Sequence, residues 1–60
     1  MELIYTIETE KETWDCGSTL SEVMEECQWL NCDDYNDVTI ITYLVDSEGK
    51  RIKIDEYCYR

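Results

Sequence analysis

The longest helical pattern runs from Ser18 to Leu30, where apolar and polar positions alternate with the period of an α-helix. Successive apolar residues are three, one, three and three positions apart, which puts them on one helix face: Leu20, Val23, Met24, Cys27 and Leu30. Either of the first two residues can cap the start, and Thr19 with Glu22 fits a capping box. Gly17 and Asn31 bracket the segment as helix breakers.

Three other segments have the pattern of β-strands. Residues 2–9 alternate between two faces, and residues 38–45 are almost all β-branched or aromatic, which makes them the strongest strand signal. Residues 51–59 return after a hairpin at 46–50, in which a type I turn is followed by Gly49 in the left-handed conformation. Residues 10–16 form a polar connection from the first strand to the helix.

The hairpin turn predicts a register in which Asp46 faces Lys50 and Leu44 faces Ile52. In this register one face of the hairpin meets the helix, and it collects Val38, Ile40, Leu44, Ile52, Ile54 and Cys58. The reverse face, which the helix leaves uncovered, collects Thr39, Ile41, Tyr43, Val45, Arg51, Lys53, Asp55 and Tyr57.

These elements predict one α+β domain over residues 1–60, with the order β-α-β-β and one helix packed on a three-stranded antiparallel sheet. A strand–helix–strand crossover usually leaves its two strands parallel, and a last strand can insert between them. The preferred sheet order is therefore first, third, second. The alternative places the first strand beside the second.

The charge of the chain limits its partners. Fifteen acidic and five basic residues give a net charge of −10, and there is no histidine. This charge repels nucleic acid, so direct nucleic-acid binding is not expected and a basic partner is the natural counterpart. The sequence shows no signal peptide and no apolar run long enough to cross a membrane, which favours a cytoplasmic location, that of the host cell if the protein is phage-encoded.

The four cysteines do not form a metal-binding pattern. Structural zinc sites usually contain ligand pairs two to four residues apart, and the cysteines lack that spacing: Cys16, Cys27, Cys32 and Cys58. We expect no metal and no other cofactor, with Cys27 and Cys58 as small buried apolar residues. A disulfide framework, and a zinc or redox module, remain the alternatives.

Catalytic motifs are also missing. The chain has no histidine base, no nucleophilic serine motif and no glycine-rich phosphate loop. Asp33, Asp34 and Asp37 resemble part of a calcium loop, but the glycine required at the sixth position is Val38. An enzyme is therefore not expected.

The acidic residues are distributed unevenly. Residues 1–46 hold twelve of the fifteen acids and one of the five bases. The candidate partner-binding residues are ten of these twelve acids and two aromatics that can serve as contacts: Glu8, Glu10, Glu12, Asp15, Glu22, Glu25, Glu26, Asp33, Asp34, Asp37, Trp14 and Tyr35. The group can be a solvated surface that keeps the protein soluble, or an anionic surface spaced like nucleic-acid phosphates.

In size, charge and predicted layout, the whole chain resembles small acidic phage-encoded inhibitors, in particular anti-CRISPR proteins. The resemblance implies a nucleic-acid mimic that occupies a basic surface of a CRISPR effector complex or of another nucleic-acid-binding protein. It rests on no diagnostic motif, so it assigns no residue a role.

An interaction subunit is the alternative from another class. The uncovered sheet face would carry Ile41, Tyr43, Val45 and Tyr57, and tyrosines are frequent interface anchors. Such a face can be solvated, can pair in a homodimer or can dock a partner, so the sequence allows a monomer or a homodimer.

Overall fold

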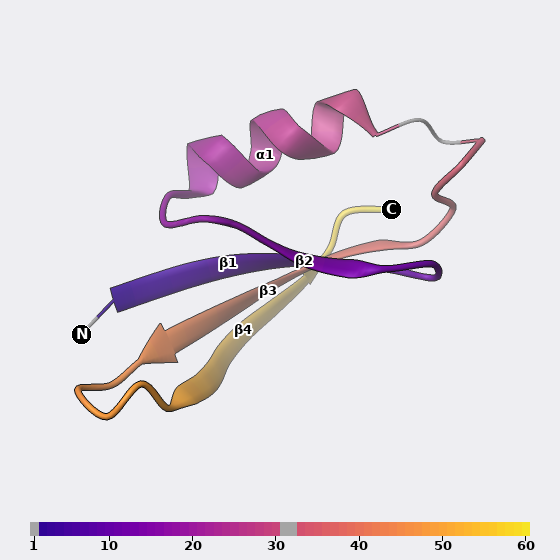
Figure 1. Ribbon diagram of the computed structural model, residues 1–60. Coiled ribbons are helices and arrows are strands. Elements are labelled where there is room, and N and C mark those ends of the chain that lie inside the picture. Colours follow the sequence, from indigo (N-terminus) through magenta and orange to yellow (C-terminus); the bar gives the residue numbers. More distant parts are fainter. Residues whose placement is uncertain (1, 31–32) are drawn as a thin grey trace.

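The computed structural model describes residues 2–30 and 33–60. They form four strands in one antiparallel sheet of order β2-β1-β3-β4, with one helix on one side of it (Figure 1). The elements are β1 (Glu2–Thr9), β2 (Thr13–Gly17), α1 (Leu20–Trp29), β3 (Val38–Val45) and β4 (Arg51–Cys58). The predicted α+β class is confirmed, but the sheet has four strands and not three.

The additional strand is β2, which lies in the segment predicted as a polar connection. Thr9 closes the turn between β1 and β2, because its backbone N–H donates to the Glu12 carbonyl at 2.9 Å. The Thr9 hydroxyl also accepts from the backbone N–H groups of Lys11 and Glu12 at 3.2 and 2.9 Å. A threonine side chain thus stabilises a tight turn that contains no glycine or asparagine, so the usual hairpin signal is missing from the sequence.

β2 also changes the order of the sheet. β1 lies beside β3 (residues 38–45) and runs antiparallel to it. The preferred order, with the last strand between these two, is therefore wrong. The alternative, which places the first strand beside residues 38–45, is confirmed for this pair of strands. Because β2 reverses the chain, the crossover through α1 starts from β2. It joins β2 to β3, which run parallel with β1 inserted between them.

The helix starts at the predicted N-cap, and the two residues of the predicted capping box contact each other, although their second bond joins the two side chains. Thr19 is the N-cap, and its hydroxyl accepts from the Glu22 backbone N–H at 3.3 Å and lies 2.8 Å from Glu22 Oε1. α1 is slightly shorter than predicted, since it begins at Leu20 and ends at Trp29. The predicted breaker Asn31 and the residue after it, Cys32, lie outside the described residues.

The hairpin between β3 and β4 has the predicted turn and, near the turn, the predicted register. Gly49 adopts a positive φ of 82° and its N–H donates to the Asp46 carbonyl at 3.0 Å. Leu44 pairs with Ile52 as expected, but the register shifts by one between Thr42 and Tyr43, which makes Ile54 the extra residue of a β-bulge.

The bulge turns the second half of β4 over. Cys58 pairs with Thr39, so it faces away from α1, although it was predicted to face the helix. Asp55 and Tyr57 pair with Thr42 and Ile40, so they lie on the helix side, although they were predicted on the reverse face.

The core lies between α1 and the two central strands. Its buried members are Ile7, Val23, Cys27, Val38 and Ile40. α1 packs on β1 and β2, and Figure 1 shows β4 at the edge of the sheet farthest from it. Every residue of β4 is therefore exposed, including Ile52 and Ile54, which were predicted in the core face. Within residues 2–30 and 33–60, no helix has the length and apolarity needed to cross a membrane.

Candidate protein-binding surface

Three glutamates and a tryptophan form one outward-facing row on α1, which we call the helix stripe: Glu22, Glu25, Glu26 and Trp29. Steps of three and four residues place them on one side of a helix, opposite the buried Val23 and Cys27. All four are exposed, and Trp29 is 80% exposed, more than any other large apolar side chain described. An amphipathic ring surrounded by carboxylates is well suited to contact a basic protein.

The helix stripe is not neutralised by the protein's own bases. Neither of the two ion pairs that the described residues form involves α1, and its last turn carries no basic residue. The pKa of the nearby Cys16 thiol is raised, mainly by burial and further by the charges of Glu26 and Glu22. The negative charge of the stripe is therefore available to a partner.

A second group of acids lies at the end of the molecule where β1 turns into β2. Glu10 accepts from the backbone N–H groups of Asn36 and Asp37, at distances of 2.7 to 3.1 Å. The Tyr35 hydroxyl donates to the Glu12 carboxylate at 3.2 Å, which raises the pKa of the tyrosine. These contacts bring two predicted acid groups together, but they also give Glu10 and Glu12 a structural role in fixing the loop before β3.

The two aromatics predicted as contacts take part in packing. The rings of Trp14 and Tyr35 lie 6.0 Å apart, and both side chains are half-buried against the core. Lys11 lies 5.6 Å from the centre of the Tyr35 ring. Trp14 and Tyr35 thus join the β1–β2 turn to the loop before β3.

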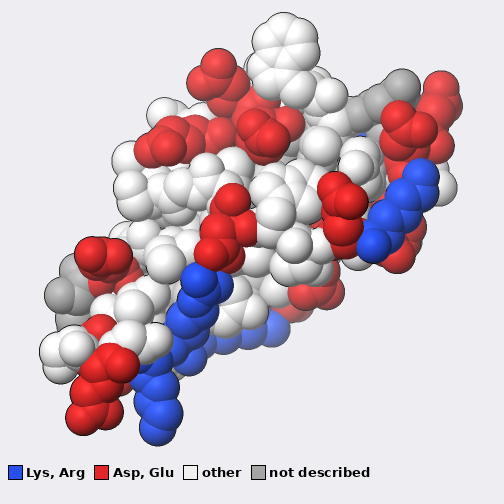
Figure 2. All heavy atoms as spheres, viewed as in Figure 1, with Lys and Arg blue, Asp and Glu red and all other residues white. Residues whose placement is uncertain are grey.

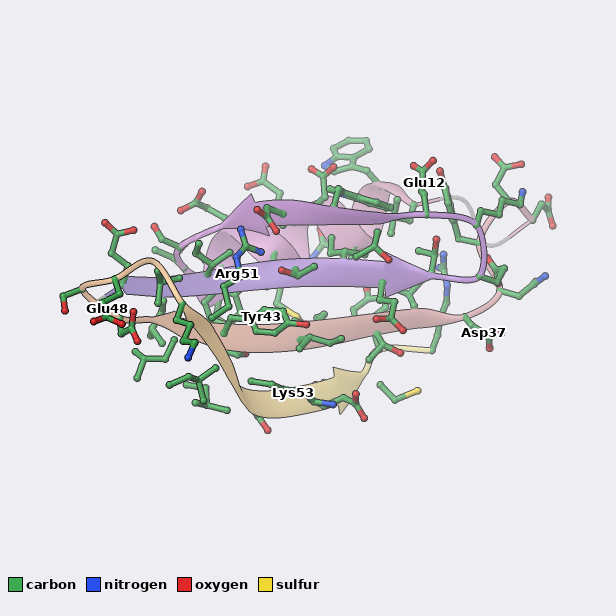
Figure 3. All side chains as sticks on the ribbon, turned by 60° about the horizontal axis from the view of Figure 1, so that its bottom comes forward. Glu12, Asp37, Tyr43, Glu48, Arg51 and Lys53 are labelled. Carbon is green, nitrogen blue, oxygen red and sulfur yellow. The ribbon has the colours of Figure 1, made fainter. Side chains whose placement is uncertain are left out.

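The sheet side away from α1, here called the open face, holds the remaining two predicted acids. Asp15 on β2 binds Arg51 of β4 through two hydrogen bonds of 2.9 and 2.7 Å, and this contact holds the pKa of Asp15 below its usual value. Arg51 also lies 5.9 Å from the centre of the Tyr43 ring, and Figure 3 shows it crossing the open face toward β2. Glu8 is exposed on the same face, where it pairs with Thr39.

The predicted acids therefore fall into three places and not along one edge. Figure 2 shows acidic side chains over α1 and a second group at the end of the molecule, where one basic side chain also lies, while the other basic side chains on this face lie toward the β3–β4 hairpin, next to further acids. Glu22, Glu25 and Glu26 lie in the helix stripe, and Glu8 and Asp15 lie on the open face. The end group contains Glu10, Glu12, Asp34 and Asp37, and the exposed Asp33 directly precedes Asp34 in the loop.

The main candidate contact residue that the sequence prediction missed is the exposed Trp29. Its position could have been found, because it follows Glu25 and Glu26 by four and three residues and so shares their side of the helix. An aromatic at this spacing lies outside the apolar face and has no core to enter.

Cys16 of β2 packs against the core near Cys27 of α1, whereas Cys58, which was predicted to be buried, lies on the edge strand β4. Cys27 is buried in the core, where burial raises the pKa of its thiol, and Cys58 is exposed on β4. In the part of the chain that the structure describes, no three potential metal ligands come together. Cys32 is not described.

Comparison of the chain with protein-family models, curated proteins and solved structures finds no significant match.

Proposed function

We propose that this protein is a non-enzymatic inhibitor that binds a basic, nucleic-acid-binding surface of another protein through the helix stripe. The observation that supports this most is the exposed row of glutamates around Trp29, which no basic residue of α1 neutralises. The target surface would contact the carboxylates with lysines and arginines and would receive the indole ring in an apolar or guanidinium-lined site.

The charge density of the stripe supports mimicry of a nucleic acid. Glu22 to Glu26 span about 6 Å of helix axis and carry three negative charges. That is one charge per about 2–3 Å, against one per about 1.7 Å in duplex DNA. A groove that binds DNA phosphates can therefore meet a comparable density of charge on α1. Because the chain resembles anti-CRISPR proteins in size and charge, CRISPR effector complexes are the first targets to test.

The test compares two variants that lose the same charge at different places. Glu25→Gln with Glu26→Gln removes two charges from the stripe, whereas Glu2→Gln with Glu48→Gln removes two exposed charges elsewhere; Figure 3 shows Glu48 at the opposite end from Glu12 and Asp37. Glu22 is left unchanged because it belongs to the capping box. Affinity for guide-loaded effector complexes is measured in about 0.15 M salt, with and without competing target DNA.

We expect the stripe variant to bind at least about tenfold more weakly, a loss of about 1.4 kcal/mol, and the control to bind nearly as the parent does. Trp29→Ala should weaken binding by a similar factor without lowering thermal stability, because the ring is 80% exposed. DNA should compete with the parent protein. Equal affinities for the two double variants, or binding that DNA does not displace, would argue against mimicry through α1.

A further inference from the structure

We propose that two copies of this chain associate through β4, edge to edge, into one continuous eight-stranded sheet. β4 ends the sheet order, so the backbone groups on its outer side meet no strand among those described. All eight of its residues are exposed, although the strand is long and contains no proline. Such an edge is a template for pairing with another strand.

The apolar side chains of β4 lie beside an open groove. The groove has a volume of about 550 Å³ and lies between α1 and the end of the sheet, and its lining includes Leu20, Met24, Ile40, Ile54 and Tyr57. Ile52, Ile54 and Tyr57 are each about half exposed, which leaves apolar surface in water next to the unpaired strand edge. A second β4 would cover this side of the groove and bury these residues.

The charge of β4 favours a second copy as the occupant. The whole chain has a net charge of −10, but β4 carries two bases and two acids and is neutral. Two chains that approach through this strand therefore meet at an edge with no net charge, away from the helix stripes that repel each other.

The β-bulge makes β4 complementary to itself. In an antiparallel pair, residues opposite each other must share a sheet face. Ile52 and Tyr57 face the helix side, because they pair with Leu44 and Ile40 of β3. Lys53 and Glu56 face the open side, because they pair with Tyr43 and Ile41. A two-fold axis between Ile54 and Asp55 satisfies both pairs.

In this register Ile52 lies opposite Tyr57 of the second copy, and Lys53 lies opposite Glu56. Lys53 already binds Glu56 of its own chain at 2.8 Å, and the dimer would extend this pair into a network of four charges. Lysines and bulges often protect a sheet edge from pairing, but here both have a complement across the axis. Because the axis is perpendicular to the sheet, both helix stripes stay exposed on the same side, so this proposal does not depend on the proposed function.

The decisive experiment separates pairing between chains from pairing within one chain. Lys53→Glu gives a strand with two acids at positions 53 and 56, and Glu56→Lys gives a strand with two bases there. Neither variant alone can form the pair within its chain or with its own copy, but a mixture of the two restores both pairs between chains. Molar mass is measured by sedimentation from about 10 μM to about 1 mM protein.

We expect the parent to form dimers within this range, each variant alone to dimerise at least about tenfold more weakly, and the equimolar mixture to recover dimers. Glu2→Lys is the control for net charge, since it has the same charge as Glu56→Lys but an unchanged β4, so alone it should dimerise as the parent does. Circular dichroism confirms that each variant is folded. A parent that is monomeric at 1 mM, a β4 variant that dimerises as the parent does, or a mixture that remains monomeric would overturn the proposal.

A second arm tests where the axis lies. In the proposed register the two Asp55 carboxylates approach each other diagonally across the axis, which costs association energy. Asp55→Asn should therefore tighten the dimer several-fold. An unchanged or weaker dimer would show that the axis is not between Ile54 and Asp55.

Discussion

Glu10 shows how a single carboxylate can determine the conformation of a distant segment. It lies in the β1–β2 turn, yet its two oxygens accept from backbone N–H groups of Asn36 and Asp37. These N–H groups belong to the loop between α1 and β3, where no strand or helix could pair them. The residue is therefore part of the framework that positions the loop, although it lies among acids predicted to bind a partner.

Replacing Glu10 by alanine should destabilise the protein by about 1–2 kcal/mol, because hydrogen bonds to a charged acceptor are lost. For a chain of this size, that corresponds to a fall in melting temperature of about 4–16 °C. Glu8→Ala is the matched control, since it removes an exposed carboxylate of β1 that makes no hydrogen bond within the described residues. Equal melting temperatures for the two variants would contradict the structural role of Glu10.

At the scale of elements, α1 is held by a small number of buried residues. Val23 and Cys27 are almost inaccessible to solvent, while Met24 and Leu30 are only partly buried and Leu20 is 56% exposed. The apolar face predicted for the helix is therefore used unequally, because α1 covers β1 and β2 and leaves the groove beside β4 open.

Val23→Ala should destabilise the protein by about 2 kcal/mol, since it removes two buried methyl groups and leaves a cavity. Leu20→Ala removes a larger side chain from the same face but should cost much less, because that side chain is more than half exposed. Chemical denaturation with urea measures both. A larger loss for Leu20→Ala would mean that the groove is closed in solution.

The elements that could be predicted from the sequence are those with a local signal. The alternation of residues 2–9, the capping box at Thr19 and the left-handed Gly49 each depend on nearby residues, and each was found where it was expected. The fold and the candidate site could be predicted only this far, because the remaining features depend on tertiary contacts.

Two unpredicted features show this limit. The β1–β2 turn is closed by a threonine side chain and not by turn residues, so β2 gave no pattern to detect. The bulge at Ile54 adds one residue to β4, where the apolar alternation changes phase from Ile52 and Ile54 to Tyr57, but the predicted register continued through it without a shift. Because a shift of one residue reverses every later side chain, the faces of Asp55, Tyr57 and Cys58 were all assigned wrongly.

The same reasoning applies to the candidate site. The helix stripe follows from helical spacing and could be located from sequence, whereas the structural roles of Glu10, Glu12 and Asp15 depend on partners more than twenty residues away or on another strand. Charge alone does not distinguish a carboxylate that binds its own backbone from one that is free to meet a partner.

At the scale of the whole molecule, shape and charge oppose each other. The protein measures 39 × 20 × 15 Å, so one helix lies on one sheet with little interior. A chain of this length buries only about 60% of the surface that its unfolded form exposes. A net charge of −10 over so small a body adds repulsion, which the ion pairs Asp15–Arg51 and Lys53–Glu56 offset only locally.

Salt should therefore change folding and binding in opposite directions. Added sodium chloride screens the repulsion among the acids of the folded chain, because the screening length falls from about 30 Å at 0.01 M to about 8 Å at 0.15 M. The melting temperature should rise over this interval, and it should rise less for Glu25→Gln with Glu26→Gln, which carries less charge.

Binding to a basic target should weaken over the same interval, since the same ions screen the attraction between the helix stripe and its partner. Thermal melts and affinity measurements on one set of samples test both effects. A melting temperature that falls with salt would show that the ion pairs of β4 outweigh the acidic repulsion, and binding that strengthens with salt would exclude the helix stripe as the main contact.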